Sequence, residues 1–442
     1  MGGAVISLRN KSYLKRKEQI EQGDNEQALY EVIDDVVEYL VTEKADLIRE
    51  IEREEISQSE INQPISDYIQ RKNIVVKEAK ELDEIIKAVK DFLWGYGVIN
   101  EYIEKSNVSD IAIKKLGDYW IKIDGRRKNI DLPLTTEKSI ENFCNAVALK
   151  NSGNLTQRNA ILVTGDSETS KDFNLRINLG IKPVADNSYV LIRKIPKWTI
   201  KPSLETLCFE KNMFNEEMYE YIKEIFSLGL NVCVCGEGGS GKSTLINAGI
   251  EHIPDHESKL GIQEIPELSS GKGNWIWLNV IKASGESEVE YTLEKLATQG
   301  LTMDVDWYII GESKGGESMG LFDASYTGHK IAFTVHAPNS EMALDKVVFN
   351  MKKSGTDYTD EKLKELLSTL DVIIFMDKYK VIELTEIEGY DKENKKMILN
   401  PVFEFNTVKD NGYDLFGDWI KKNASCEKII KKKKSRGKVI NE

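Results

Sequence analysis

The sequence predicts an α/β protein in which a mostly parallel sheet carries a phosphate-binding loop. Three observations support this fold class. From about residue 226 to residue 420, short apolar runs typical of buried strands alternate with helical segments. A glycine-rich motif lies between one such run and the helical segment that follows it. The composition, with 40% hydrophobic and 30% charged residues in 442, is that of a folded chain rather than a disordered one.

Two further regions are predicted upstream of this sheet. From Leu29, apolar residues recur at three- and four-residue steps among many charges, and a second stripe spans Leu82 to Leu93, so both stretches are predicted helices. From Ser109 the apolar period changes to two, which indicates strands. The predicted organisation is a charged helical extension (1–79), an α+β N-terminal domain (80–197), a linker and helix (198–225), the α/β domain (226–420) and a basic tail (421–442).

Charge is distributed unevenly along the chain. The formal net charge is −13, yet residues 421–442 carry nine basic and two acidic side chains. The acidic remainder lacks the clustered positive charge that phosphate contacts need, so no sequence-specific nucleic-acid binding is expected. The tail is interpreted as solvated and disordered, with weak contact to anionic lipid as the alternative. No apolar run reaches about 18 residues, so no membrane span is expected and the chain is predicted to be cytoplasmic.

The five cysteines are interpreted as core residues. Cys233 and Cys235 alternate with valines in NVCVC, which is typical of a buried strand, and no CxxC pair occurs. A metal or redox function for this pair is the less favoured alternative.

The strongest functional signal is GEGGSGKS, which starts at Gly236 and fits the pattern GxxxxGK[ST]. Glycines allow successive backbone N–H groups to turn toward a phosphate, and the following helix directs its N-terminal dipole at the same anion. Lys242 is expected to reach the β- and γ-phosphates and Ser243 to bind Mg²⁺. The predicted nucleotide-binding residues are Gly236, Glu237, Gly238, Gly239, Ser240, Gly241, Lys242, Ser243 and Thr244.

Two carboxylates are candidates for the hydrolytic chemistry. Glu312 follows the apolar run WYIIG, so it would lie at the end of a buried strand, where it could orient the attacking water or bind Mg²⁺ through water. Glu267 lies in a second segment, GIQEIPEL, that looks like a strand entering a carboxylate-bearing loop. An ordinary acidic turn is the alternative for Glu267.

Two of the four histidines flank a predicted strand. A strand at IAFTV would place His329 and His336 at its two ends, where the pair could sense or stabilise a γ-phosphate. A structural histidine at a strand end is the ordinary alternative.

These segments together resemble the type II/type IV secretion and pilus-assembly ATPase family. In chain order, GEGGSGKST resembles its Walker A loop, IQEIPEL its acidic box, DWYIIGESKGGES its Walker B region and TGHKIAFTVHA its histidine box. The segments NLRINLGIKP and VLIRKIP resemble its arginine-bearing strands. The resemblance covers roughly residues 85–405, and the branch that serves tight-adherence (Flp-type) pili looks most similar.

The resemblance implies a hexameric ring of RecA-like domains, each with an N-terminal domain, that binds ATP and Mg²⁺. It implies phosphate and Mg²⁺ roles for Lys242 and Ser243, and matches Glu267 to the acidic box and Glu312 to Walker B. It further matches His329 and His336 to the histidine box, and Arg176 and Arg193 to arginines that approach the γ-phosphate. The implied metal-binding residues are Ser243, Glu267 and Glu312. From the residues alone, Arg176 and Arg193 would be ordinary surface ion pairs.

Several positions depart from the family pattern. Gln263 stands where the acidic box usually has Glu, Lys314 where an arginine is expected, Thr302 where another arginine is usual and Val305 where a proline is usual. Lysine cannot reproduce a bidentate guanidinium contact.

The expected function is an ATP-hydrolysing motor docked on an integral membrane platform protein at the inner face of the cytoplasmic membrane. It would power pilus or pseudopilus assembly or protein secretion. The alternatives are a conjugation-type ATPase that transfers DNA or protein, and a nucleotide-binding scaffold with little hydrolysis. A small-molecule kinase is disfavoured because it accounts for neither the paired histidines nor the long upstream region.

Overall fold

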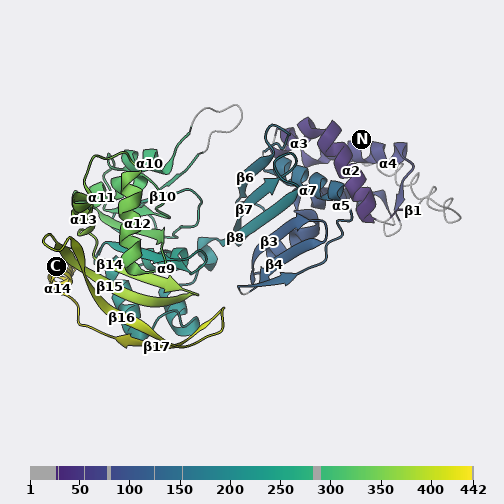
Figure 1. The fold of residues 1–442 in the computed structure, drawn as a ribbon. Coiled ribbons are helices and arrows are strands. Elements are labelled where there is room, and N and C mark those ends of the chain that lie inside the picture. Colours follow the sequence, from purple (N-terminus) through teal and green to yellow (C-terminus); the bar gives the residue numbers. More distant parts are fainter. Residues whose placement is uncertain are drawn as a thin grey trace. The chain divides into compact units, whose positions relative to one another are not determined.

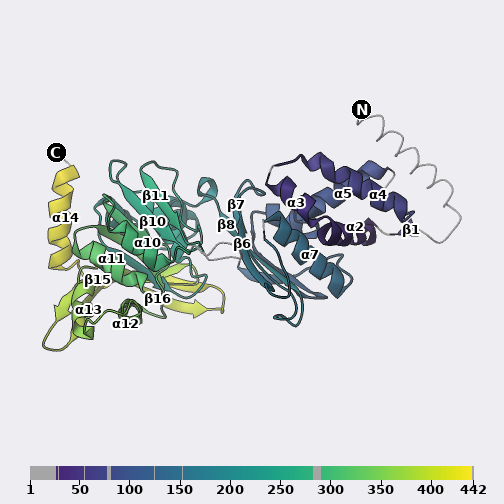
Figure 2. The same cartoon turned by 90° about the horizontal axis from the view of Figure 1, so that it is seen from above.

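The computed structural model describes residues 26–440, apart from residues 28, 54, 77–80, 124, 152 and 282–289. The chain divides into two compact units, residues 1–196 and residues 197–442 (Figures 1 and 2). The finer division into five segments stays a prediction. Among the described residues, no helix combines the length and the apolar character that a membrane span requires.

The helices of the first unit pack on one another through amphipathic faces. Helix α2 buries Ile33, Val36 and Leu40, which lie on the stripe predicted from Leu29 onward. Helix α5 buries Leu82, Ile85, Val89 and Leu93 in the same way. The bounds are α2 (Leu29–Glu43), α3 (Ala45–Glu52), α4 (Asn62–Arg71), α5 (Leu82–Trp94), α6 (Asn100–Glu104) and α7 (Glu137–Lys150), with short 3₁₀ turns at Gln58–Ile61 and Gly97–Ile99. Two short strands, β1 (Glu26–Gln27) and β2 (Val75–Val76), pair in parallel.

The described strands β3 to β8 of the first unit form an antiparallel sheet in the order β5-β4-β3-β8-β7-β6. Their bounds are β3 (Val108–Lys115), β4 (Asp118–Ile123), β5 (Arg126–Asn129), β6 (Ile161–Asp166), β7 (Phe173–Gly180) and β8 (Tyr189–Pro196). Helix α7 begins at a capping box made by Thr136 and Ser139 and buries Ile140, Phe143 and Val147 in the core that it shares with this sheet.

The second unit is built on a sheet with the order β11-β10-β12-β13-β9-β14-β15-β16-β17 among its described strands. The strands from β11 to β14 in this order are parallel to their neighbours, and β15 to β17 continue the sheet antiparallel. The predicted α/β class is therefore confirmed. The bounds are β9 (Val232–Gly236), β10 (Lys259–Gln263), β11 (Trp275–Asn279), β12 (Trp307–Ile310), β13 (Lys330–His336), β14 (Val372–Asp377), β15 (Lys380–Asp391), β16 (Lys396–Asp410) and β17 (Leu415–Lys421).

Both faces of this sheet are covered by helices (Figure 1). Along β9, Val232 and Val234 join one core, and Cys233 and Cys235 join the other, because successive side chains point to opposite faces. The first core includes α8 (Glu216–Ser227) and α9 (Lys242–Ile250). The second includes α10 (Leu293–Gly300), α11 (Glu317–Tyr326), α12 (Ser340–Lys352) and α13 (Asp360–Leu367). All five cysteines are buried and free, which confirms the core interpretation of Cys233 and Cys235.

The prediction that the basic tail is disordered is wrong for its described part. Residues Glu427–Ile440 form helix α14, which lies against the second unit (Figure 2). Ile429 is fully buried in the core, and Lys428 donates to the carbonyl oxygens of Leu370 (2.7 Å) and Ser368 (2.9 Å). Lys432 forms an ion pair with the fully buried Asp371. Composition counted the charges of the tail but could not reveal that their partners lie in the folded unit.

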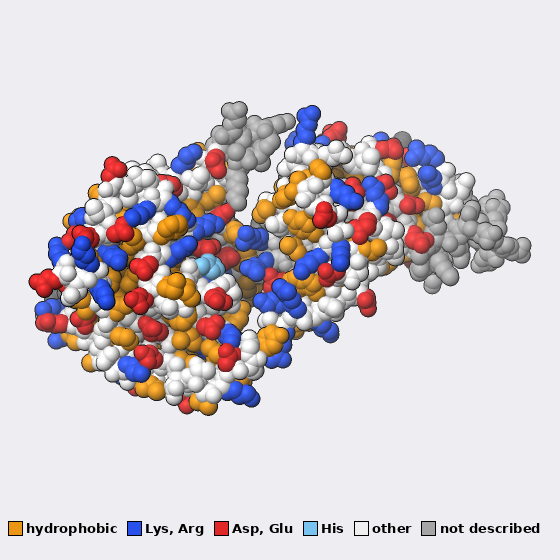
Figure 3. All heavy atoms as spheres, viewed as in Figure 1, with side chains coloured by type: hydrophobic (Ala, Val, Ile, Leu, Met, Phe, Trp, Pro, Cys, Tyr) orange, Lys and Arg blue, Asp and Glu red, His pale blue; other side chains and the backbone are white. Residues whose placement is uncertain are grey.

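The basic side chains of α14 that make these contacts are therefore engaged inside the protein. The expected lipid contact through a free tail loses its basis at Lys428 and Lys432. On the face of residues 197–442 that Figure 3 shows, acidic and basic side chains are interspersed. A mixed surface of this kind gives no support to electrostatic nucleic-acid binding on that face.

Candidate functional site

The phosphate loop connects β9 to α9 at the carboxyl edge of the sheet. Gly236 ends β9 with φ of 150°, and a Cβ there would lie 2.2 Å from the carbonyl oxygen of Met376. Gly241 has φ of 101° and is the N-cap of α9. Only glycine satisfies both positions without a steric clash or backbone strain. The chain after Gly241 therefore enters α9 with the helix N-terminus directed at the loop, as an anion site requires.

Lys242 is buried at the start of α9. Its ammonium donates to the carbonyl oxygens of Gly236 (3.0 Å) and Glu237 (2.7 Å), so the side chain folds back along the loop. Burial lowers the pKa of Lys242, and the negative charge of Glu312 opposes that shift. The ammonium is thus held inside the loop with an acidic group close enough to influence it.

Ser243 and Glu267 meet beside the loop. The Ser243 hydroxyl donates to Oε2 of Glu267 at 2.7 Å. Asn247, one turn further along α9, donates to the carbonyl oxygens of Ser243 (3.0 Å) and Glu267 (2.9 Å). The Asn247 side chain therefore links the backbone of Ser243 to the backbone of Glu267, which keeps the hydroxyl and the carboxylate close to each other.

This pair fits a Mg²⁺ ion that is bound together with substrate phosphates. Mg²⁺ typically takes one or two protein oxygens and leaves its other positions to water and phosphate. Among the described residues, no group of three or more His, Cys, Asp and Glu could hold a metal without other ligands. The buried hydroxyl of Ser240 in the same loop has no hydrogen-bond partner in the described structure, so it is available to form a hydrogen bond with a ligand.

Glu312 and His336 meet on the flank of the loop toward β13. Nε2 of His336 lies 3.2 Å from Oε1 of Glu312. His336 ends β13 in register with Gly236, and a Cβ at Gly238 would lie 3.5 Å from Cε1 of His336. Burial and the nearby Lys242 lower the pKa of His336, which favours the neutral ring, and the negative charge of Glu312 opposes that shift.

The structure does not bring His329 to this loop. His329 precedes β13 and His336 ends it, so about seven residues of extended strand, or roughly 20 Å, separate them. Nδ1 of His329 lies 3.1 Å from both the carbonyl oxygen of Ala324 and the hydroxyl of Thr327, at the C-terminal end of α11. The expectation that both histidines serve one γ-phosphate is therefore wrong within one chain, because the strand that pairs them in sequence separates them in space.

Gln263 and Lys314, two of the departures from the family pattern, have defined partners. The buried Gln263 amide donates to the carbonyl oxygen of Leu268 (3.1 Å) and accepts from its N–H (2.9 Å). This two-way clamp fixes the loop that carries Glu267. The ammonium of Lys314 forms an ion pair with Glu264.

The other two departures are local. The Thr302 hydroxyl donates to the carbonyl oxygen of Gln299 at 2.8 Å, just after α10, and Val305 is buried in the core ahead of β12.

Lys201 is a site residue that sequence reasoning missed. Its ammonium donates to the carbonyl oxygen of Glu267 (2.6 Å), to Ser269 Oγ (2.7 Å) and to Asn247 Oδ1 (3.2 Å). Burial lowers the pKa of Lys201 to about 8. The residue lies in the predicted linker and belongs to no motif, so no signal in the sequence could have identified it.

Arg176 and Arg193 belong to the first unit, where they pair in register on β7 and β8. Nε of Arg193 donates to Asp110 at 2.9 Å, which is the ordinary ion pair considered from the sequence. Their role toward a γ-phosphate stays a prediction.

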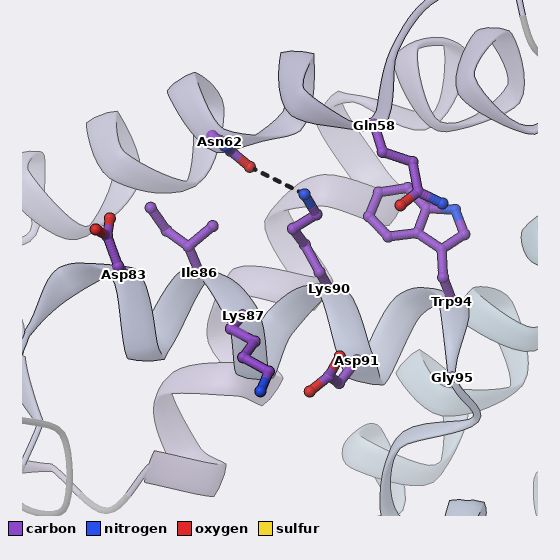
Figure 4. Close-up of a pocket in the computed structure, with 9 residues that line it drawn as sticks. All are labelled: Gln58, Asn62, Asp83, Ile86, Lys87, Lys90, Asp91, Trp94 and Gly95. Atoms are coloured by element: carbon purple, nitrogen blue, oxygen red, sulfur yellow. Dashed lines mark hydrogen bonds between the residues drawn. The ribbon is translucent and has the colours of Figure 1, made fainter. Parts of the chain in front are cut away.

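A hollow of about 530 Å³ in the first unit is not part of this site. Its walls come from α5, from the 3₁₀ turn at Gln58–Ile61 and from the first residue of α4, and Lys90 Nζ lies 3.4 Å from Asn62 Oδ1 there (Figure 4). The lining lysines, Lys87 and Lys90, are balanced by Asp83 and Asp91. None of the predicted site residues lines it.

The parallel sheet and its loop define a P-loop protein of the RecA-like kind. Residues 163–378 match the family model described as type II/IV secretion system protein. The match covers just under half of the chain, so it shows that this segment is similar to that family. Its assignment to the tight-adherence branch stays a prediction.

The chain is also similar to individual proteins over part of its length. The Methanocaldococcus jannaschii protein MJ1287 is 28% identical over 206 residues, which cover 46% of this chain and 74% of that protein. The type IV secretion system protein VirB11 of Bartonella henselae is 24% identical over 328 residues, which cover 65% of this chain and 90% of VirB11. Among solved structures, the Legionella pneumophila ATPase DotB aligns with 17% identity and a TM-score of 0.43, over 68% of this chain and 77% of DotB.

Proposed function

We propose that this protein is an ATP-hydrolysing motor of a secretion or pilus-assembly system. The observation that carries the proposal is the convergence of five polar or charged side chains on one glycine loop. These are the ammonium of Lys242, the hydroxyl of Ser243 with the carboxylate of Glu267 at 2.7 Å, and Glu312 with His336 at 3.2 Å. An ordinary glycine turn needs none of these groups.

Each group has a defined task in phosphoryl transfer to water. The loop N–H groups and Lys242 bind the β- and γ-phosphates and offset the charge that develops as the terminal phosphoryl group leaves. Ser243 and Glu267 would hold Mg²⁺, which when bound neutralises charge on the phosphate oxygens. Glu312 accepts a hydrogen bond from the attacking water and orients it.

His336 is proposed to position Glu312 rather than to react. With the proton on Nε2, the neutral imidazole donates to Oε1 of Glu312 and leaves Oε2 for the water. A carboxylate fixed in this way keeps its orientation during the reaction, which lowers the cost of organising the site.

The motor function extends this chemistry to movement. We propose a hexameric ring docked on an integral membrane platform protein at the cytoplasmic face of the membrane. Nucleotide drives motion if it binds one arrangement of the parts more tightly than another. The match of residues 163–378 to the type II/IV secretion system protein model supports this proposal.

A type IV secretion role is the second candidate. The relative named VirB11 is a type IV secretion system protein, and this chain covers 90% of its length. Direct DNA handling is disfavoured because the net charge is −13. Identifying the membrane protein that co-purifies with the chain would separate pilus assembly from type IV secretion.

The decisive experiment measures Mg²⁺-dependent phosphate release from ATP by the full chain. Lys242→Ala is expected to lose ATP binding, and Glu312→Gln is expected to keep binding while release falls by about 10²- to 10³-fold. Glu365→Gln, which changes a carboxylate paired with Lys362 and Lys392 on and near α13, is the matched control and should hydrolyse ATP like the parent. Release that is equal in the parent and in Glu312→Gln would refute the proposed role of Glu312, and absence of ATP binding would refute the whole proposal.

A further inference from the structure

The turn between β14 and β15 lies against the phosphate loop from the side opposite Glu312. In the sheet, β9 has β13 on one side and β14 on the other. On the first side His336 ends β13 and Glu312 comes after β12, so the terminal phosphate faces that flank under the proposed function. The flank at β14 is left for the nucleoside end of the substrate.

This turn has an unusual backbone conformation. Asp377 pairs with Lys380, so Lys378 and Tyr379 form a two-residue hairpin turn, and both have positive φ (44° and 61°). Such a turn ordinarily uses Asn-Gly or Gly-Gly, because bulky side chains are strained in the left-handed region. Strain of this kind persists only where surrounding contacts enforce it, and it concentrates at functional sites.

Those contacts come from the phosphate loop itself. The N–H of Tyr379 donates to the carbonyl oxygen of Ser240 at 3.1 Å. A Cβ placed on Gly241 would lie 3.2 Å from Cδ1 of Tyr379, 3.2 Å from the methyl carbon of Met376 and 3.3 Å from that of Met213. The aromatic ring and both thioether side chains therefore gather at the residue where α9 begins.

The side chains of Met213, Met376 and Tyr379 differ in burial, and only the ring of Tyr379 is accessible to a ligand. Met213 and Met376 are buried, whereas 51% of Tyr379 is exposed beside the loop. Methionine and aromatic side chains together provide a polarizable apolar surface that suits a flat aromatic group. On the opposite flank Glu312 and His336 are charged or polar. The two sides of the loop therefore differ in chemistry, as the charged phosphates and the flat base of a nucleotide do.

We propose that Tyr379 is a specificity-determining residue whose ring stacks on the base of the bound nucleotide, with Met213 and Met376 supporting it. The inference rests on the proposed function and deepens it by assigning the nucleoside end of the same site. It also accounts for the strained turn, because the positive φ at Tyr379 places its ring at the loop.

The test compares two ligands that share phosphates but differ in the base. Binding of Mg²⁺·ATP and of Mg²⁺·tripolyphosphate is measured by calorimetry for the full chain and for Tyr379→Ala. The Kd for ATP is expected to rise by roughly 5- to 150-fold, the factor that corresponds to loss of one base–aromatic stack, while the Kd for tripolyphosphate stays the same. Tyr379→Phe keeps a ring and should restore most of the ATP affinity.

Tyr326→Ala is the matched control, because Tyr326 is an exposed tyrosine at the end of α11, next to His329 and on the opposite edge of the sheet. Equal loss of both ligands in Tyr379→Ala would assign the turn to shaping the loop and overturn base stacking. Unchanged ATP affinity in Tyr379→Ala would overturn it as well. A parent chain that binds tripolyphosphate but not ATP would overturn this inference alone, whereas a parent that binds neither would overturn the proposed function itself.

Discussion

Lys201 is expected to control the position of the carboxylate that would help to bind Mg²⁺. Its ammonium holds the backbone of Glu267 and the side chains of Ser269 and Asn247 from behind the loop. Lys201→Met removes the charge and all three donors while keeping much of the side-chain length. The carbonyl oxygen of Glu267 would keep only its bond from Asn247.

The effect on stability can be estimated from the contacts. Three hydrogen bonds from a charged donor contribute about 1.5–3 kcal/mol each, or about 4.5–9 kcal/mol in all. Against this, lowering the pKa of Lys201 from 10.5 to about 8 corresponds to a burial cost of about 3.4 kcal/mol at pH 7. The free energy of unfolding is therefore expected to fall by about 1–6 kcal/mol.

The effect on turnover should be larger than this loss of stability implies. A carboxylate displaced by about 1 Å can lose roughly 100-fold in rate, so Lys201→Met is expected to reduce phosphate release by about that factor. The matched control is Lys428→Met, which also removes a lysine that donates to three carbonyl oxygens, but at the docked helix α14. Phosphate release is measured at saturating ATP and Mg²⁺, and unfolding is followed with urea.

Two results would refute this reasoning. One is a Lys201→Met protein with parental turnover, which would show that Glu267 keeps its place without the ammonium. The other is an equal loss of turnover in Lys428→Met, which would show that the rate follows global stability. The pH offers a further check, because the folded chain releases the Lys201 proton near pH 8 and the unfolded chain near 10.5. The burial cost is therefore fully present below pH 8, and it is relieved between pH 8 and 10.5 in the parent but not in Lys201→Met.

Three other outcomes follow from the same structure. Because burial and Lys242 lower the pKa of His336 below its ordinary 6.5, turnover is expected to decline only when the pH falls below 6.5, and His336→Gln should lack that decline in a pH–rate profile. Lys432→Met should lower the free energy of unfolding by about 1–3 kcal/mol, because it removes an ion-pair partner of the buried Asp371. Lys431 lies on the exposed side of α14, so Lys431→Met should change the free energy of unfolding by less than about 0.5 kcal/mol. Urea titrations measure both values. Gln263→Glu restores the usual family residue, but it should lower the free energy of unfolding by about 1–3 kcal/mol at pH 7 because a carboxylate cannot donate a hydrogen bond to Leu268. A variant that unfolds at the parental temperature would contradict the stabilising role given to the two Gln263–Leu268 hydrogen bonds.

The parts of the fold that could be predicted are those encoded locally. The stripe from Leu29 predicts α2 because a helix brings every third or fourth residue to one face. The run NVCVC predicts β9 because a strand covered on both faces needs apolar residues at every position. The loop after it could be located because its glycines meet requirements of the backbone within a few residues of one another.

The site was predicted only in part, for the same reason. Lys242, Ser243, Glu267, Glu312 and His336 were singled out by motif, and the structure brings them together at one loop. His329 was singled out with equal weight and lies at the other end of β13. Sequence spacing gives the distance along a strand but does not decide which end of it meets the loop.

The amino-acid sequence by itself determined the helices, the buried strands, the phosphate loop and the segments that resemble the secretion ATPase family. Only the tertiary structure decided that Lys201 and Gln263 hold the acidic loop, that Tyr379 lies against Gly241, and that the basic tail is a docked helix. The physical reason is that periodicity and glycine spacing report what one segment requires of its own backbone and burial. The partner of a buried charge lies tens or hundreds of residues away, as Asp371 does for Lys432, and it becomes a neighbour only when the strands have paired.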